Sequence, residues 1–228
     1  MKIVFATPTY TRPHPAYLSA LEQTVPLLDA EGIEHQTVFE VGSPYISAAR
    51  ATLTRKALDA GADTIIYIDH DMSWRPEDML TLIKTEGDVV AGTYRFKKDE
   101  EEYMGSLLTS AEGYPTVRGD GALAAHCIPA GFLKITRNGI RRFMKAYPEL
   151  LYGHPENYTV DLFNHGAHKG VWYGEDYAFS RNWRALGGEI WLVPDLQLDH
   201  HGADKCFPGN FHMFLRRQPG GDLCPSST

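Results

Sequence analysis

Two aspartates separated by one residue, Asp69 and Asp71, directly follow the apolar run Thr64–Ile68. Such a run predicts a buried strand, and ligands of open α/β sheets bind beyond the carboxyl ends of strands. Side chains two apart on an extended segment point the same way, so both carboxylates are expected to face one site. Carboxylate oxygens suit Mg²⁺ or Mn²⁺, which would stabilise a departing nucleotide diphosphate. The alternative interpretation is a turn with two solvated aspartates, because a bare Asp-x-Asp is a weak signal.

The elements that must position these aspartates alternate along the first half of the chain. Expected strands are Lys2–Ala6, Thr37–Val41, Thr64–Ile68 and Asp88–Ala91. Three helices are expected. The first is Ala16–Ala30, with Pro26 as a kink or early end. The second runs from Ser43-Pro44, as N-cap and N1, to about Ala60 before Gly61, and the third is Pro76–Lys84. This order predicts an α/β fold whose parallel sheet has helices on both faces.

The second half is less regular. We expect a hairpin or insertion over 97–130, a strand at Phe132–Ile135, a helix at Arg137–Ala146, a helix at Glu175–Leu186 and a strand at Ile190–Val193. Residues 154–170 form a long polar stretch, which favours a loop that closes over an active site. The expected organisation is one domain over 1–218, with a nucleotide-binding half to about residue 95, an acceptor-side half after it and a loose tail over 219–228.

Composition limits the partners. The 228 residues are 43% apolar and 22% charged, which is ordinary for a globular protein. A net charge of −7 disfavours a broad nucleic-acid-binding face. A negative protein that handles a nucleotide diphosphate needs a metal or local cations.

Cysteine usage and hydropathy bear on location. The three cysteines, at 127, 206 and 224, show no disulfide or zinc spacing, which favours a reducing cytoplasm. A strand expected from Lys2 leaves no room for a signal peptide, and we expect no membrane span because no apolar run approaches about 20 residues.

Several segments form one set of motifs: KIVFATPTY at 2–10, Ser47–Arg50, Asp69–Asp71, Pro129–Phe132, Tyr173–Asp176 and Asp199–Gly202. Together they resemble the GT-A glycosyltransferases, in particular the family-2-like group and its phage-type relatives. They follow in that family's order from residue 1 to about residue 202. The resemblance implies a Rossmann-like, mostly parallel central sheet with helices on both faces and a small second β element.

The resemblance also implies roles for individual residues. Mn²⁺ or Mg²⁺ would be held by Asp69, Asp71 and one of two adjacent histidines, of which His200 fits the family's His-x-Gly spacing better than His201. Asp176 would be the general base of an inverting transfer, and Glu175 would orient the acceptor or the base. The donor, expected to be a UDP-sugar, would contact Pro8, Thr9, Tyr10, Glu40, Arg50, Asp69, His70, Ala130, Gly131 and Trp172.

Several of these residues also have an interpretation that involves no ligand. Arg50 would be a solvated helix arginine, and Glu175 with Asp176 would be first-turn acids favoured by the helix dipole. Trp172 would be a rim or core residue rather than a sugar platform. A zinc cluster of His154, His165 and His168 is disfavoured, since the spacing fits no known pattern.

The function predicted from these patterns is transfer of a sugar from a nucleotide-sugar to a hydroxyl acceptor. A modified DNA base is an alternative acceptor, which the phage-type relatives raise. A phosphohydrolase of the haloacid dehalogenase type is a second class, although that family places its aspartate pair after the first strand. A nucleotide-sugar-binding protein without turnover, or a nucleotidyltransferase of related fold, is a third.

Overall fold

The structure, a computed structural model, describes residues 1 to 218. An eight-stranded sheet crosses it in the order β2-β1-β3-β8-β5-β13-β7-β6, and β8 and β7 run opposite to the other six strands. Its strands are β1 (Lys2–Thr9), β2 (Glu34–Val41), β3 (Thr64–Ile68), β5 (Val89–Ala91), β6 (Ser106–Leu107), β7 (Leu123–Cys127), β8 (Phe132–Thr136) and β13 (Trp191–Leu192). The predicted fold class, α/β with a mostly parallel central sheet, is therefore confirmed.

Both faces of the sheet are buried, and the central strands show this residue by residue. On β1, Ile3 and Phe5 belong to one core cluster, whereas Val4 belongs to the other. On β3, Ile66 and Ile68 share the cluster of Ile3 and Phe5. Successive side chains of a strand point to opposite faces, so a continuous apolar run is what a strand covered on both sides requires.

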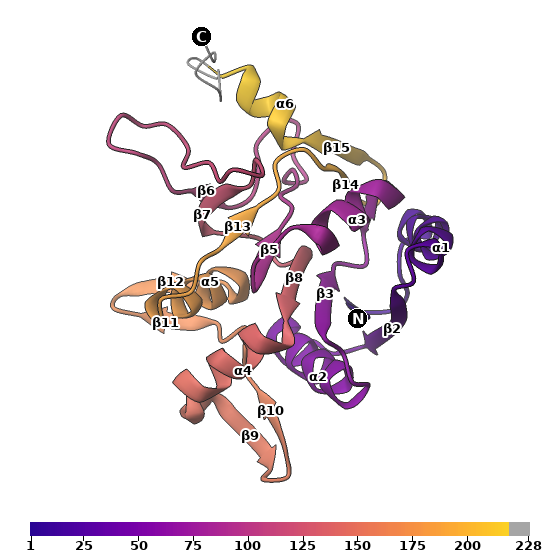
Figure 1. Ribbon diagram of the computed structural model, residues 1–228, viewed down its shortest axis with the longest axis vertical. Coiled ribbons are helices and arrows are strands. Elements are labelled where there is room, and N and C mark those ends of the chain that lie inside the picture. Colours follow the sequence, from indigo (N-terminus) through magenta and orange to yellow (C-terminus); the bar gives the residue numbers. More distant parts are fainter. Residues whose placement is uncertain (219–228) are drawn as a thin grey trace.

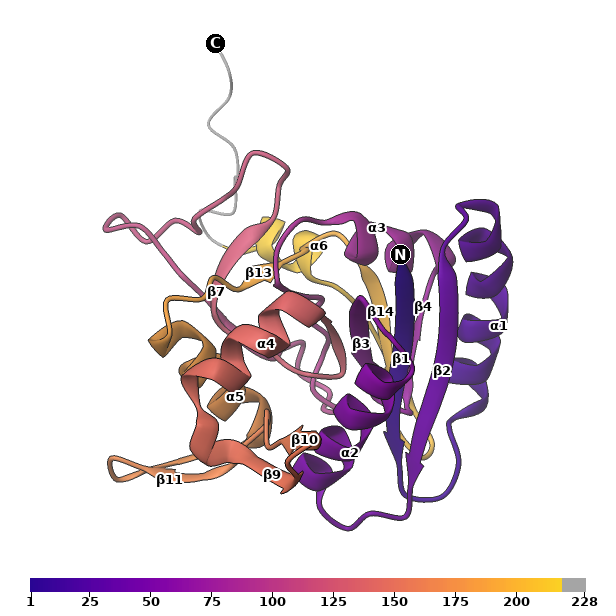
Figure 2. The same ribbon diagram turned by 60° about the horizontal axis from the view of Figure 1, so that its bottom comes forward.

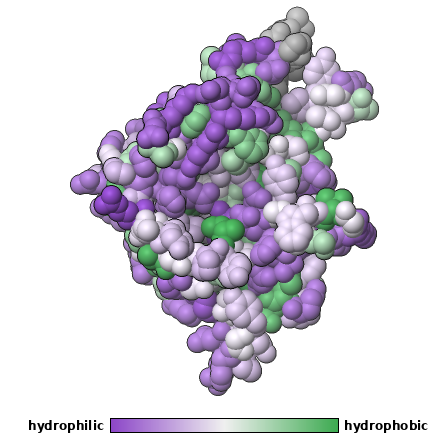
Figure 3. Space-filling view, turned by 180° about the vertical axis from the view of Figure 1, so that it is seen from behind, coloured by the Kyte–Doolittle hydropathy of each residue, from purple (hydrophilic) through white to green (hydrophobic). Residues whose placement is uncertain are grey.

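The helices supply the two covers (Figures 1 and 2). One core cluster packs the sheet against α1 (Pro15–Ala30) and α3 (Pro76–Lys84). The other packs it against α2 (Ile46–Asp59), α4 (Arg137–Ala146) and α5 (Glu175–Ala185). The face seen from behind is mainly hydrophilic, with hydrophobic residues in small separate groups (Figure 3).

Several predicted boundaries hold, whereas others differ, such as the start of β2 at Glu34 instead of Thr37. The bounds of α3, α4 and β3 are those expected, and α1 runs through Pro26 to Ala30. Helix α2 begins at Ile46, after Ser43-Pro44, and its N-cap is Tyr45. The Ser43 hydroxyl donates to the Tyr45 carbonyl instead of capping the helix, so the predicted cap pair was wrong.

The expected loop over 154–170 is structured, and that prediction was wrong. It contains parts of two antiparallel hairpins that project from the body of the protein, β9 (Leu151–His154) with β10 (Asn157–Val160), and β11 (Gly166–His168) with β12 (Val171–Tyr173) (Figure 1). Between the hairpins, Leu162 and Phe163 are fully buried in the core. A polar sequence therefore contains two apolar anchors that fix it.

The predicted small second β element is a three-stranded sheet, β15-β14-β4. It joins β4 (Met72–Trp74), which directly follows the two aspartates, to β14 (Gln197–His201) and β15 (Cys206–Asn210). The remaining elements are a short 3₁₀ helix at Pro148–Leu150 and α6 (Phe211–Arg216). The predicted loose tail, residues 219 to 228, lies outside the described residues. No helix in the described part of the chain is long and apolar enough to cross a membrane.

Candidate functional site

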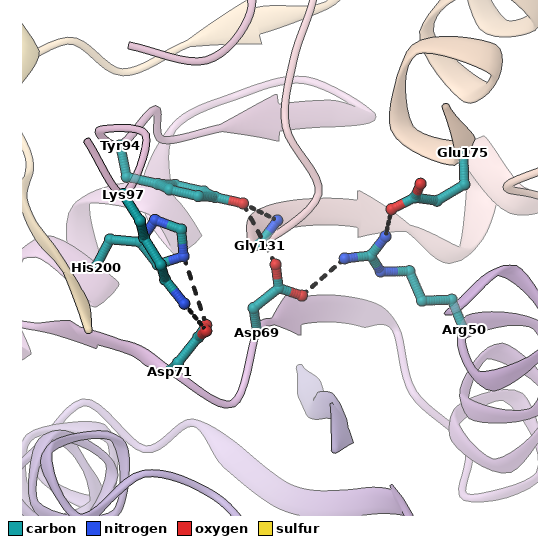
Figure 4. Close-up of polar contacts among 8 residues, drawn as sticks. All are labelled: Arg50, Asp69, Asp71, Tyr94, Lys97, Gly131, Glu175 and His200. Atoms are coloured by element: carbon teal, nitrogen blue, oxygen red, sulfur yellow. Dashed lines mark hydrogen bonds and ion pairs between the residues drawn. The ribbon is translucent and has the colours of Figure 1, made fainter. Parts of the chain in front are cut away.

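Asp69 and Asp71 lie where buried β3 ends, and the chain turns there. The Met72 amide donates to the Asp69 carbonyl at 3.1 Å, so the segment is a turn and not an extended strand. The expectation that both carboxylates point the same way was therefore wrong in its geometry. The two side chains have different partners (Figure 4).

Asp69 belongs to a partly buried ion network whose central cation is Arg50. Arg50 on α2 donates to Asp69 Oδ1 at 2.7 Å and to Glu175 Oε1 at 2.5 Å. Arg50 is 2% exposed, so the interpretation as a solvated helix arginine is wrong. Burial opposes its charge, but Asp69 and Glu175 outweigh burial and raise the pKa of Arg50. A guanidinium can serve two carboxylates at once because its donors form a rigid fork.

Tyr94, which follows β5, supports Asp69 from the other side. Its hydroxyl accepts from the Gly131 amide at 3.0 Å and donates to Asp69 Oδ2 at 3.4 Å. Burial and the nearby Asp69 carboxylate raise the pKa of Tyr94 well above its usual value, so the hydroxyl stays protonated. A Cβ on Gly131 would lie 2.1 Å from the Tyr94 hydroxyl oxygen and 2.5 Å from Asp69 Oδ2, so this close approach requires glycine.

Asp71 faces His200, and strand pairing is the reason. β14 pairs antiparallel with β4 so that His200 lies opposite Met72. His200 Nε2 is 3.7 Å from Asp71 Oδ1, and the Lys97 ammonium donates to Asp71 Oδ2. These two contacts lie on the side of the turn away from Arg50 (Figure 4).

The tautomer of His200 is fixed by its other nitrogen. Nδ1 lies 2.8 Å from the Arg95 carbonyl, which can only accept, so Nδ1 carries a proton. Burial lowers the pKa of His200, against the opposing effects of the Arg95 contact and Asp71, so the ring is neutral at pH 7. Nε2 therefore presents a lone pair to a carboxylate oxygen. Two electron-rich atoms that face each other in this way make a fitting pair of ligands for a cation.

The adjacent histidine faces elsewhere. His201 Nε2 is 2.8 Å from the Ser73 hydroxyl, and its ring stacks on His14 with centroids 4.5 Å apart. Neighbouring residues of a strand point to opposite faces, so His200 and not His201 meets Asp71. Within residues 1 to 218 no three His, Cys, Asp or Glu side chains converge as a metal cluster, because the Asp69 carboxylate is turned to Arg50 and Tyr94.

Glu175 and Asp176 open α5 beside this network. Glu175 is bound to Arg50, and Asp176 Oδ1 accepts from the Tyr177 amide at 2.8 Å. Burial and the neighbouring Glu175 charge raise the pKa of Asp176 to about 6, although Arg50 and the Tyr177 amide act in the other direction. A carboxylate with a pKa near the working pH is suited to accept a proton.

The residues predicted to bind the donor lie on several elements at the carboxyl edge of the sheet. Pro8 and Thr9 end β1, and Pro8 pairs with Glu40 of β2, whose carboxylate meets Lys56 at 2.7 Å. Tyr10 is 69% exposed, whereas Thr9 is buried and its hydroxyl has no hydrogen-bond partner in the described chain.

The other predicted donor residues surround the aspartates. The Gly131 carbonyl accepts from the Asp69 amide at 3.1 Å, and Ala130 is buried next to it. His70 lies between the aspartates, and its buried Nδ1 has no partner among residues 1 to 218. Trp172 is 71% exposed on β12. The centroids of its ring and the His165 ring are 6.1 Å apart, and His165 contacts Ser47 at the start of α2.

Sequence reasoning missed the stretch Tyr94–Lys97, which it assigned partly to an insertion. This stretch contacts Asp69 through Tyr94, His200 through the Arg95 carbonyl, and Asp71 through Lys97. A signal was present, because Tyr94 follows an apolar strand that runs parallel to β3 and ends at the same edge. Residues after such strands line the ligand crevice.

Comparison with known proteins gives structural matches. A197 from STIV matches with a TM-score of 0.52 and 16% identity, covering 92% of this chain and 95% of that one. A mutant of Drosophila β1,4-galactosyltransferase 7 in complex with manganese, UDP-Gal and xylobiose matches with a TM-score of 0.45 and 12% identity, covering 90% of this chain and 69% of that one. Residues 1–349 of S. aureus TarS in complex with UDP-GlcNAc match with a TM-score of 0.45 and 12% identity, covering 91% of this chain and 58% of that one. The chain thus spans less than two thirds of the TarS fragment.

No protein-family model matches the sequence, and no curated protein does. At these identities the structural matches show the fold alone. The function must therefore be argued from the site itself.

Proposed function

We propose that this protein is a GT-A glycosyltransferase, which transfers a sugar from a UDP-sugar to a hydroxyl acceptor with the help of a divalent metal. The observation that carries the proposal is the pair formed by Asp71 and His200. A neutral imidazole with Nδ1 bound to a carbonyl turns its Nε2 lone pair toward a carboxylate at the edge where α/β sheets bind ligands.

Asp71 and His200 are the residues that would hold the metal, with Asp69 beside them. The Asp71 carboxylate matches the donor preference of Mn²⁺, and the Arg95 carbonyl supplies the outer contact that orients His200 as a liganding histidine. When bound, the metal would act as a Lewis acid on the developing charge of the departing diphosphate. Arg50 and Tyr94 hold Asp69 beside this pair.

The donor is assigned to the edge formed by the ends of β1 and β2, the turn after β3 and the approach to β8. Thr9 there presents a buried hydroxyl without a partner in the described chain, and exposed Tyr10 follows it. A buried hydroxyl of this kind costs stability unless a partner satisfies it. A nucleotide is a suitable partner, and exposed Trp172 offers an aromatic face to a sugar.

Asp176 is assigned the role of general base. Its raised pKa, to about 6, leaves it ionised at pH 7 but basic enough to take the acceptor hydroxyl proton. Glu175 keeps negative charge beside it, while Arg50 holds Glu175 in place. Attack assisted from the face opposite the leaving diphosphate inverts the anomeric configuration.

A thermal-shift screen of nucleotide-sugars with and without Mn²⁺ tests the proposal. A ligand that binds only the folded state raises the melting temperature, so a UDP-sugar is expected to do so only when Mn²⁺ is present. His200→Gln should abolish the Mn²⁺-dependent part, whereas the matched change His201→Gln should retain it. A full shift in excess chelator would remove the metal from the proposal, and no shift with any nucleotide-sugar would remove the donor.

A further inference from the structure

One short stretch of chain, Tyr94–Lys97, contacts all three residues of the proposed metal site. The Tyr94 hydroxyl reaches Asp69, and the Arg95 carbonyl fixes the ring of His200. Both contacts are compatible with a bound metal, because neither uses the atoms that Asp71 and His200 turn toward each other. The third contact is different, because the Lys97 ammonium lies on the Asp71 carboxylate itself.

Lys97 and a divalent cation therefore compete for the same negative charge. We propose that Lys97 is a tethered cation, which occupies Asp71 until a divalent metal displaces it and then binds the diphosphate of the nucleotide. This inference rests on the proposed function, since it concerns how the donor site fills. It makes Lys97 a diphosphate-binding residue.

Charge and mobility support the exchange. An ammonium and a divalent ion on one carboxylate repel each other strongly at the few ångströms that would separate them. The Lys97 side chain is 35% exposed and the Asp71 side chain 18%, so the ion pair lies where solvent reaches it. Ion pairs of this kind are weak, and the flexible four-carbon stem of lysine lets its charge move without the backbone.

The neighbouring cations have other partners, which makes Lys97 the candidate for the phosphates. Arg50 is buried between Asp69 and Glu175. The Arg95 guanidinium donates to the carbonyls of Lys98 and Asp99. Once it leaves Asp71, Lys97 has no other ion-pair partner in residues 1 to 218. Lysine serves as a point-charge ligand for phosphate.

The variant Lys97→Met, with Lys98→Met as the matched control, tests both proposed functions of Lys97: competition with the metal for Asp71, and binding of the diphosphate. Lys98 is the adjacent lysine, pairs with Glu102 and carries the same charge, so its loss changes the net charge equally. Binding of Mn²⁺ is measured by electron paramagnetic resonance of the unbound ion, and binding of UDP at saturating Mn²⁺ by calorimetry. Lys97→Arg keeps the cation and should remain close to the unmodified protein in both assays.

The two affinities should change in opposite directions. Lys97→Met should bind Mn²⁺ roughly three- to tenfold more tightly and UDP about tenfold more weakly, while Lys98→Met changes neither. A merely structural role would weaken both. If the unmodified protein binds both ligands and Lys97→Met leaves both affinities unchanged or weakens both, this inference alone is overturned. If no form binds Mn²⁺ or UDP, the proposed function fails and the inference fails with it.

Discussion

Asp69 and Asp71 are separated by one residue but lie in contrasting surroundings. Asp69 is held on one side by Arg50 and on the other by the Tyr94 hydroxyl. Asp71 meets a neutral imidazole across 3.7 Å and a lysine on a flexible stem. The turn between the two aspartates separates these environments, since it directs their side chains to different partners.

The difference suggests that the two aspartates have different roles, Asp69 a structural one and Asp71 a ligand-binding one. Partners of Asp69 come from α2, from the segment after β5 and, through Arg50, from α5, so this network ties distant parts of the chain together. Lys97, by contrast, contacts Asp71 and makes no hydrogen bond to Asp69, Arg50 or Tyr94, so it can leave Asp71 without breaking that network. A site that binds and releases a charged ligand needs both properties, a rigid frame and one exchangeable position.

The largest expected effect is a loss of turnover when Asp176, which lies beside the Asp69 network, is changed. Asp176→Asn keeps the shape of the side chain and removes its basicity, so turnover should fall by about 10²- to 10⁴-fold. Mn²⁺ and UDP binding should remain nearly unchanged, because the contacts assigned to those ligands involve other residues. Steady-state kinetics with calorimetry check both parts, and proton NMR of the first product checks its configuration. Near-normal turnover or a retained anomeric configuration would remove Asp176 from the base role.

Removal of Arg50, the central cation, tests whether the Asp69 network stabilises the fold. Arg50→Met leaves two partly buried carboxylates without their partner and should lower the free energy of unfolding by about 3 kcal/mol. Arg55→Met on the same helix removes an i,i+4 pair with half-exposed Asp59 and a hydrogen bond to the Tyr158 carbonyl, and should cost about 1–2 kcal/mol. Urea denaturation of both variants measures the difference. Equal losses would show that Arg50 stabilises the fold no more than Arg55 does.

Tyr94 connects the two environments, because it bonds to Asp69 and its ring packs edge-on against His200. Tyr94→Phe removes the donor to Asp69 and the acceptor of the buried Gly131 amide, which should cost about 1–3 kcal/mol. Outer contacts of this kind typically change metal affinity by about 10- to 100-fold, so Mn²⁺ binding should weaken as well.

Tyr147→Phe is the control for that experiment. It also removes one hydroxyl contact to the backbone, the bond to the Asn182 carbonyl, but it makes no contact with either aspartate. It should reduce stability and leave Mn²⁺ affinity unchanged. If both variants weaken Mn²⁺ binding equally, Tyr94 affects the site only through general stability.

The sequence predicts the frame of this site better than its contacts. Strand β3 and helix α3 have strong local signals, a five-residue apolar run and a proline at the helix start, and both form as expected. Arg50 could not be assigned in the same way. Its burial depends on Glu175, which lies 125 residues away along the chain.

Local patterns also failed where a turn or a hairpin decides the outcome. The alternation rule assumed an extended Asp69–Asp71 segment, but the chain turns there before β4 pairs with β14. The hairpin strands within 151–173 are only three or four residues long, so they show no clear alternation, and buried Phe163 between them was not used. Lys97 was missed because nothing local distinguishes it from Lys98.

The smallest expected effect is a change in the pH dependence of turnover. Burial and Glu175 raise the pKa of Asp176 to about 6. A base acts only when deprotonated, so the rate should fall as pH drops below about 6, by about tenfold per pH unit once Asp176 is protonated.

Glu175→Gln removes the neighbouring negative charge and one of the two partners of Arg50, and both changes favour ionised Asp176. The midpoint should therefore move to lower pH, as read from initial rates at saturating donor. Lys56→Gln, which removes a charge that pairs with Glu40, is the control and should leave the midpoint in place. A midpoint that stays fixed in Glu175→Gln would separate the acidic limb from Asp176 and from the network around Asp69.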